Sequence, residues 1–271
     1  MPGHATAAER LDLVIEIGDV PIRLCVDDPK FIRLLETRYA GFVTPRREAS
    51  FEFDIEIAPE ALASPDQDVL LRWDSGCWRL DRSDFHAVWN PSSARGKIRQ
   101  TANPYSIDSV LRIVHTILLA KKGGFLVHAS SAVRNGRSFV FAGVSGSGKT
   151  TMARLAPPDA MLLTDEISYI CRKGAEYCAF GTPFVGELAR AGENLSAPIA
   201  AVYLLAKGAE NRIEPLSQGE GVHALLQNIL FFAKEREMVD LVFQAACDFV
   251  SRVPVHRLVF RPNADIWELV V

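Results

Sequence analysis

The sequence lacks a framework of paired cysteines. Its 271 residues include five cysteines, an odd number, and no two of them are spaced as a C-x-x-C pair. A disulfide scaffold or a zinc cage is built from such pairs, so neither is expected. We expect five reduced thiols, as in a cytosolic protein.

Long apolar stretches and a surplus of positive charge are missing as well. No apolar run reaches the roughly 18 residues that can cross a membrane, and the first ten residues lack the apolar core of a signal peptide. The formal net charge of −3 gives no basic footprint for nucleic acid. The sequence therefore predicts a cytoplasmic protein that binds neither nucleic acid nor membranes.

What the sequence does contain is the composition of an ordinary globular protein, 48% hydrophobic and 23% charged. A chain of this length forms one large domain or two small ones. The turn-forming pair Asn103–Pro104 is the best candidate for a boundary. We predict an α/β protein in which residues 1–102 form a smaller α+β domain and residues 103–271 carry the chemistry. Amphipathic helices are expected near residues 222–233 and 237–250.

The predicted first domain shows clear structural patterns but no group of residues with recognisable chemistry. Residues 11–17 and 21–26 are typical of a β-hairpin, and residues 51–57 alternate apolar with acidic side chains, as a strand with one buried face does. Residues 58–68 are expected to form a Pro/Ala/Asp loop. A lid, a dimerisation surface and a substrate-docking module stay open as roles for this domain.

A glycine-rich stretch dominates the predicted second domain. Residues 143–151, Gly-Val-Ser-Gly-Ser-Gly-Lys-Thr-Thr, fit the phosphate-loop pattern G-x-x-x-x-G-K-[ST] at every fixed position, between a strand-like and a helix-like run. Glycines allow successive backbone N–H groups to surround an anion, and a helix N-terminus adds its positive dipole end. The predicted nucleotide-binding residues are Gly143, Ser145, Gly146, Ser147, Gly148, Lys149, Thr150 and Thr151.

A strand predicted at residues 161–164 ends on two acids, Asp165 and Glu166. In phosphate-loop enzymes such an acid completes a Mg²⁺ site together with a hydroxyl group of the loop. Lys149 and Asp165 are 16 positions apart, whereas the corresponding acid comes much later in motor, transporter and helicase ATPases. The short gap also leaves no room for the switch segment of a regulatory GTPase. The spacing therefore favours a different kind of phosphate-loop enzyme.

The ordered set of motifs resembles the HPr kinase/phosphorylase group, which is related to ATP-dependent phosphoenolpyruvate carboxykinases. The matching segments are 126–130 (Leu-Val-His-Ala-Ser), 143–150 and 163–166 (Leu-Thr-Asp-Glu). The likeness is closer to the HPr-kinase-related proteins that accompany peptide-modification systems, including lasso-peptide kinases. Those proteins share a helix over residues 103–113, the segment 181–187 (Gly-Thr-Pro-Phe-Val-Gly-Glu) and an ending like residues 253–262.

This resemblance implies an HPr-kinase-like phosphate-loop kinase domain that transfers the γ-phosphoryl group of ATP, with Mg²⁺, to a serine-type hydroxyl of a protein or peptide. The segment that mediates HPr binding and phosphorolysis in true HPr kinases has no match here, so neither that acceptor nor the reverse reaction is expected. Relatives in the group are often oligomeric, and the resemblance extends this expectation to a homo-oligomer.

The resemblance also implies roles for individual residues. The loop and its lysine would hold the triphosphate, and Thr150 with Glu166 would hold Mg²⁺, while Asp165 would accept the proton of the acceptor hydroxyl. His128 would lie near the γ-phosphate, and Glu187 would bind the acceptor or support the site. The group has two aspartates where this chain has Asp165 and Glu166. Either acid can therefore be the base and either the metal ligand.

Two other functions are compatible with the same residues. One is a small-molecule kinase acting on free serine or a similar alcohol, which needs a closed polar pocket beside Asp165. The other is a non-catalytic module that binds a nucleotide tightly and gates a partner. The substitution Asp165→Asn separates a kinase from a gating module, because general-base assistance is worth about 10²–10⁴-fold in rate.

Overall fold

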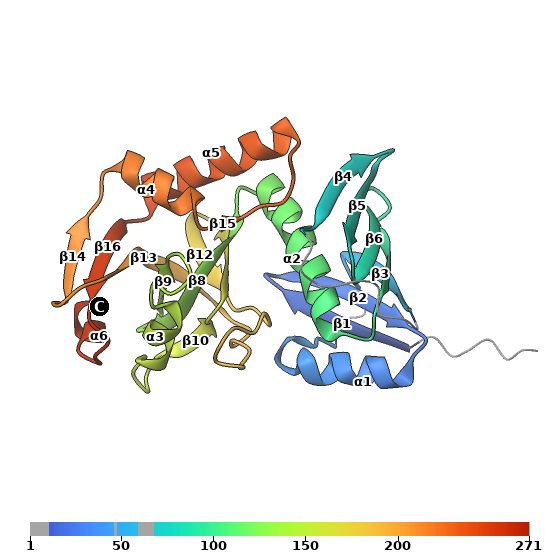
Figure 1. Cartoon of the computed structure of the whole chain (residues 1–271), viewed down its shortest axis with the longest axis horizontal. Helices are drawn as coiled ribbons and strands as arrows, with labels where there is room; N and C mark the ends of the chain where they lie inside the picture. Colours follow the sequence, from blue (N-terminus) through green and yellow to red (C-terminus); the bar gives the residue numbers. More distant parts are fainter. Residues whose placement is uncertain (1–10, 46–47, 59–67, 271) are drawn as a thin grey trace, which may run out of the picture. The chain divides into compact units, whose positions relative to one another are not determined.

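The computed structural model describes residues 11–45, 48–58 and 68–270 (Figure 1). Most of the loop expected at residues 58–68, and the first ten residues, lie outside this part. The chain is mixed α/β, with more strand than helix and with two sheets, so the predicted class is confirmed at this level. It divides into two compact units, Met1–Leu111 and Arg112–Val271. The boundary expected after residue 102 stays a prediction.

The described part of the first unit holds one sheet of seven strands, in the order β1-β2-β3-β7-β6-β5-β4. Its elements are β1 (Leu11–Ile17), β2 (Val20–Val26), α1 (Pro29–Arg38), the 3-10 helix η1 (Ala40–Phe42), β3 (Phe51–Ile57), β4 (Leu70–Asp74), β5 (Cys77–Arg82), β6 (Phe85–Asn90) and β7 (Arg95–Gln100). β1 and β2 pair antiparallel, so the predicted hairpin is confirmed. The alternation of β3 is confirmed too, because Phe53 and Ile55 are buried.

A buried carboxylate ties the start of helix α2 (Pro104–Lys121) into the first unit. Asp108 is 3% exposed and accepts hydrogen bonds from two guanidinium nitrogens of Arg38, the Nε bond measuring 3.1 Å. The Tyr39 hydroxyl donates to the same carboxylate at 2.5 Å. A buried charge is tolerated when it is both paired and hydrogen-bonded, and Asp108 meets both conditions.

The described part of the second unit holds a sheet of nine strands, with the path β10-β8-β11-β12-β13-β16-β14, β15 paired to β8, and β9 paired to both β8 and β13. Its elements after α2 are β8 (Phe125–Arg134), β9 (Arg137–Ala142), α3 (Lys149–Arg154), β10 (Met161–Thr164), β11 (Ile167–Lys173), β12 (Glu176–Phe180), β13 (Ser196–Lys207), β14 (Arg212–Pro215), α4 (Gln218–Leu226), β15 (Ile229–Leu230), α5 (Arg236–Arg252), β16 (Val255–Phe260) and α6 (Ile266–Leu269).

Strand β9 determines where the glycine-rich stretch lies. It pairs antiparallel with β8 through a turn at Asn135–Gly136, where both residues have positive φ angles, 53° and 73°. This is the geometry that an Asn-Gly hairpin favours. On its other side β9 pairs parallel with β13, with Ala142 opposite Leu204. Because parallel strands end at the same edge, the residues that follow β9 and the last residues of β13 come together.

The helix expected over residues 222–233 is wrong in its second half. Helix α4 ends at Leu226, and residues 229–230 form β15, which pairs antiparallel with Val127 and Leu126 of β8. The Asn228 side chain donates to the Ala224 carbonyl at 2.8 Å at this transition. An apolar run of this length satisfies helix and strand periodicity alike, so sequence alone could not separate them.

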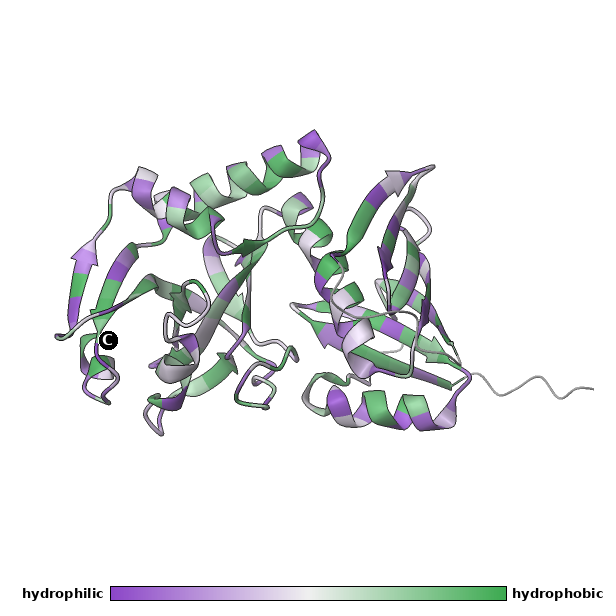
Figure 2. Ribbon diagram, in the orientation of Figure 1, coloured by the Kyte–Doolittle hydropathy of each residue, from purple (hydrophilic) through white to green (hydrophobic). Residues whose placement is uncertain are grey.

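Helix α5 agrees with its expected position, residues 237–250, to within two residues at each end. It buries Met238, Val242 and Phe249 on one face, and Figure 2 shows hydrophobic and hydrophilic residues along it. The Phe249 ring packs edge-on against Phe125 of β8, with ring centroids 5.3 Å apart. In the described part of the chain, no helix combines the length and apolar character needed to cross a membrane.

Candidate functional site: a pocket at the glycine loop

The glycine-rich stretch forms the connection between β9 and α3, here called the glycine loop (residues 143–148). Gly146 and Gly148 have φ angles of 75° and 112°, which residues with side chains rarely adopt. A Cβ atom on Gly148 would lie 2.5 Å from Cζ of Phe260, and one on Gly143 would lie 2.5 Å from Oγ of Ser147. The shape of the loop therefore requires these glycines.

Lys149 is the first residue of α3, and its side chain folds back onto the loop. The ammonium donates to the carbonyl oxygens of Gly143, at 2.8 Å, and Val144, at 3.2 Å. Partial desolvation lowers the pKa of Lys149, while the charges of Glu166 and Glu187 act in the opposite direction. Two of the predicted acids therefore lie within electrostatic reach of the lysine.

A turn held by Thr164 places the two neighbouring acids at the end of β10. The Thr164 hydroxyl accepts hydrogen bonds from the N–H groups of Glu166 and Ile167, both at 3.2 Å. Threonine hydroxyls commonly bond the backbone at turns in this way. The two acids then have different surroundings, because Asp165 is 2% exposed and Glu166 is half-buried.

Asp165 is bonded to a backbone segment more than 20 positions further along the chain. Its Oδ1 atom accepts the N–H of Gly186 at 3.1 Å, and its Oδ2 atom accepts the N–H of Leu188 at 2.8 Å. Both carboxylate oxygens therefore hold a backbone donor. The sequence predicted Asp165 as a base or a metal ligand. It did not predict that Asp165 would hold a distant backbone segment by hydrogen bonds.

The segment after β12, residues 181–193, carries Glu187 to the same place. Its backbone runs beside β10, where the N–H of Thr182 donates to the Leu163 carbonyl at 3.1 Å. Glu187 then lies between the two residues whose N–H groups bond Asp165. A residue 22 positions beyond Asp165 is thus fixed beside it by main-chain hydrogen bonds.

His128 lies on β8, opposite Ile167, the first residue after the two acids. Its backbone N–H donates to the Asn228 carbonyl at 2.8 Å. Desolvation of the imidazole, followed by the positive charges of Lys149 and Arg112, lowers the pKa of His128. This direction favours the neutral imidazole, the form that can accept a proton.

These groups line one cavity of about 490 Å³, here called the glycine-loop pocket. The predicted residues found in its lining are His128, Gly143, Ser145, Gly146, Gly148, Lys149, Thr150, Thr151, Asp165, Glu166 and Glu187. Ser147 is predicted but is not part of the lining; its hydroxyl is buried without a hydrogen-bond partner. The structure brings the predicted residues from four separate segments of the chain to one place.

Three polar residues of the lining were missed from the sequence: Lys207, Gln227 and Asn228. Lys207 is the last residue of β13, whose parallel pairing with β9 brings it to the edge where the glycine loop begins. Gln227 and Asn228 connect α4 to β15. No local motif marks these positions, because they depend on strand pairing between distant segments.

The pocket fits the phosphate chain of a nucleotide with Mg²⁺. The glycine loop adopts a glycine-dependent conformation next to a lysine ammonium, the arrangement that surrounds phosphate groups in phosphate-loop proteins. Thr150 and Glu166 offer oxygen atoms, which Mg²⁺ prefers. Magnesium commonly uses one or two carboxylates together with substrate phosphates, so a cluster of three acids is not required.

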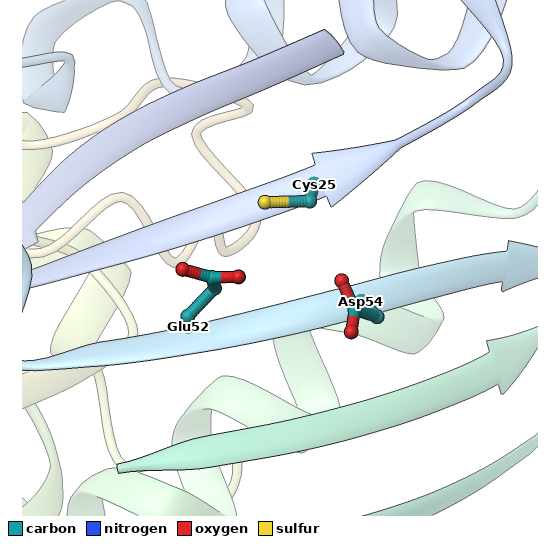
Figure 3. A group of neighbouring side chains, drawn as sticks. All are labelled: Cys25, Glu52 and Asp54. Carbon is teal, nitrogen blue, oxygen red and sulfur yellow. The ribbon is translucent and has the colours of Figure 1, made fainter. Parts of the chain in front are cut away.

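Among the described residues, one group of three cysteine, histidine or acidic side chains is close enough to share an ion. Cys25, Glu52 and Asp54 have ligand atoms within 4.8 Å of one another on β2 and β3 of the first unit (Figure 3). The acids of β3 lie opposite a basic row on β7, with Glu52 facing Arg95 and Asp54 facing Lys97. Glu52 forms an ion pair with Arg95 at 3.9 Å, so a positive charge on the neighbouring strand offsets part of the negative charge of this group.

The family model of ScmC, the SynChlorMet cassette protein, matches residues 97–270. Because this match spans well over half of the sequence, the chain belongs to the ScmC family. No curated protein matches the sequence. The expected membership in the HPr kinase group is therefore wrong. A glycine loop followed by a strand that ends on acids is not confined to one family, so the ordered motifs could not identify it.

Proposed function

We propose that this member of the ScmC family transfers the γ-phosphoryl group of ATP to a serine-type hydroxyl of a protein or peptide. The observation that supports the proposal is the presence of the glycine loop, Lys149, Thr150 and the two acids after β10 in one pocket. The conformation of an ordinary glycine-rich turn does not require an ammonium, a hydroxyl and carboxylates close to it. In this proposal residues 103–271 form a phosphate-loop kinase domain.

The chain's own residues divide the binding work. The glycine loop and Lys149 bind the triphosphate, and Lys149 exchanges its two loop carbonyls for phosphate oxygens. Thr150 and Glu166 would hold Mg²⁺ through their side-chain oxygens. Bound MgATP supplies the phosphoryl group and a cation that neutralises charge during transfer.

The reaction is an in-line exchange of one phosphorus–oxygen bond for another. The oxygen of the acceptor hydroxyl bonds to the γ-phosphorus as the bond to the bridging oxygen breaks, and ADP leaves with that electron pair. The hydroxyl proton passes to a carboxylate of the pocket. His128, whose lowered pKa favours the neutral imidazole, lies where it can take part in moving that proton.

The free cysteines support a reducing location for this reaction. Cys25, Cys77, Cys171, Cys178 and Cys247 form no disulfide. Thiols persist in this state in the cytosol. A cytoplasmic protein is therefore part of the proposal. The net charge of −3 adds the expectation that nucleic acid is not a partner.

The proposal is tested with γ-labelled ATP and Mg²⁺ in extract of the native cell. Wild type is compared with Lys149→Ala, and with Glu193→Gln as a control, since that side chain forms an exposed ion pair with Arg190. We expect label on a protein or peptide with wild type and control, and its loss with Lys149→Ala. Label on a small molecule would show a metabolite kinase instead, and ATP binding without any transfer would show a gating module.

A further inference from the structure

Asp165 and Glu166 are adjacent in sequence but are used differently by the structure. Asp165 is almost fully buried, and each of its oxygens accepts a backbone N–H, from Gly186 and Leu188. Glu166 is half-buried in the lining of the glycine-loop pocket, and its charge acts on Lys149. Both acids line the pocket, but only Asp165 has both carboxylate oxygens bonded to backbone N–H groups.

We infer that Asp165 is a positioning residue that clamps the turn Gly186–Leu188, and that Glu187, presented by this turn, accepts the hydrogen bond of the acceptor hydroxyl. The second half of this inference rests on the proposed function. The sequence pattern of a strand that ends on acids favours Asp165 for the contact with the acceptor hydroxyl. The inference assigns this contact to Glu187, which lies 22 positions later.

The geometry of the turn supports the clamp. The two N–H groups that bond Asp165 belong to the residues on either side of Glu187, so the carboxylate grips the turn at both ends. The N–H of Ala189 closes the turn by donating to the Gly186 carbonyl at 3.1 Å. Bonds from N–H groups to an ionised carboxylate are stronger than neutral ones. The position of Glu187 is therefore determined by Asp165.

Gly186 shows how closely the turn approaches both acids. A Cβ atom at this position would lie 2.7 Å from Oε2 of Glu166 and 2.8 Å from Oδ2 of Asp165. Any side chain here would displace at least one carboxylate. The glycine thus allows the turn to reach Asp165 while leaving Glu166 in the pocket.

Exposure separates the candidates for the acceptor contact. Glu187 is exposed and lines the glycine-loop pocket, so its carboxylate meets a hydroxyl that arrives from solvent. Asp165 is 2% exposed, and each of its oxygens already accepts a backbone N–H, so it is less accessible to an arriving hydroxyl than Glu187.

The clamp is tested by amide hydrogen exchange of the full chain without nucleotide. In Asp165→Ala the amides of Gly186 and Leu188 are expected to exchange at least about tenfold faster, since each loses a charged acceptor. In Glu187→Gln they should exchange as in wild type. Unchanged exchange in Asp165→Ala would overturn the clamp. If that variant does not fold, Asp165→Asn keeps one carbonyl acceptor, and faster exchange of at least one of the two amides is then expected.

The role of Glu187 is tested by single-turnover release of labelled phosphate from γ-labelled ATP, with water as the acceptor. Glu187→Gln should slow release by about 10²-fold or more at unchanged ATP affinity, and Glu193→Gln should have no effect. If Asp165 acts through Glu187, the double variant Asp165→Asn/Glu187→Gln is about as slow as Glu187→Gln alone. The assignment would be overturned if the two substitutions reduced the rate of phosphate release independently, so that their effects multiplied in the double variant. It would also be overturned if Asp165→Asn slowed release while Glu187→Gln released phosphate at the wild-type rate.

Failure of the proposed function gives a separate result. Wild-type protein that binds ATP but neither releases nor transfers its γ-phosphate would overturn phosphoryl transfer, and the role of Glu187 with it. Exchange at Gly186 and Leu188 would still decide whether Asp165 clamps the turn.

Discussion

The ring of Phe260 occupies the space in which a side chain on Gly148 would have to lie. Phe260 ends β16, and its Cζ atom would be 2.5 Å from a Cβ atom built on Gly148, whose φ angle is 112°. The last glycine of the loop is therefore constrained twice, by its backbone conformation and by a buried aromatic ring from a strand more than 100 positions away.

Gly148→Ala is expected to weaken ATP binding by tenfold or more. Strained backbone of this kind costs on the order of 1–3 kcal/mol, and the methyl group must in addition displace Phe260, so the loop changes shape. Isothermal titration with ATP and Mg²⁺ measures the loss. Gly219→Ala is the control, because a Cβ atom on Gly219 in α4 meets nothing within 4 Å. Equal ATP affinity in both variants would show that this loop conformation is not the binding one.

Glu166→Gln is expected to raise the Mg²⁺ concentration needed for half-maximal ATP binding by about tenfold. The amide keeps one oxygen but loses the negative charge that a divalent cation favours. A Mg²⁺ titration at fixed ATP concentration shows the shift. The contrary result, an unchanged Mg²⁺ requirement, would remove Glu166 from the metal site.

Asp108→Ala is expected to destabilise the first unit by up to about 3–5 kcal/mol, because it removes the buried partner of the partly buried Arg38 guanidinium. Urea unfolding monitored by tryptophan fluorescence measures the change. Asp74→Ala is the matched control: Asp74 and Arg79 form an ion pair in which both side chains are about half exposed, and such exposed pairs add little to stability. Similar losses in both variants would argue against a special role of the buried carboxylate.

His115 is expected to make the protein less stable as the pH falls. Burial, with the charge of Lys122, lowers the pKa of His115 to about 3, compared with about 6.5 in an unfolded chain. Between these values the unfolded state binds a proton that the folded state does not. Stability is then lost as pH decreases, by about 2–3 kcal/mol between pH 6.5 and 4.5.

His115→Phe should remove this contribution, and urea unfolding at the two pH values measures it. His223→Gln, at an exposed position of α4, is the control that should keep the wild-type pH dependence. An unaltered pH dependence in His115→Phe would mean that other groups cause the acid sensitivity.

The parts of the site that sequence could predict are those with local signals. The glycine loop, the Asn135–Gly136 hairpin before it and the strand that ends on Asp165 and Glu166 each carry their own pattern within a few residues. Lys207 carries none, because its place in the pocket depends on β13 lying parallel to β9. The hydrogen bonds by which Asp165 fixes the turn around Glu187 also join distant parts of the chain. Their donors are backbone N–H groups, which any sequence provides, so no residue pattern marks them.

The short strand β15 shows a second limit of prediction from the sequence. Ile229 and Leu230 continue the apolar period of α4, so the pattern predicts a helix, yet they pair with Leu126 and Val127 of β8. This pairing brings Asn228 against the backbone of His128. Because Ile229 and Leu230 fit a helix as well as a strand, the sequence could not place Gln227 and Asn228 in the pocket.

The bonds from Lys149 to the carbonyl oxygens of Gly143 and Val144 have a consequence for nucleotide binding. The ammonium already has two acceptors and has lost part of its water, so an anion that reaches the loop has to compete with the protein's own backbone. In the proposed function, a bound triphosphate replaces these two neutral acceptors with charged oxygens, which bind an ammonium more strongly, so the same lysine stabilises the loop when it is empty and the nucleotide when it is bound.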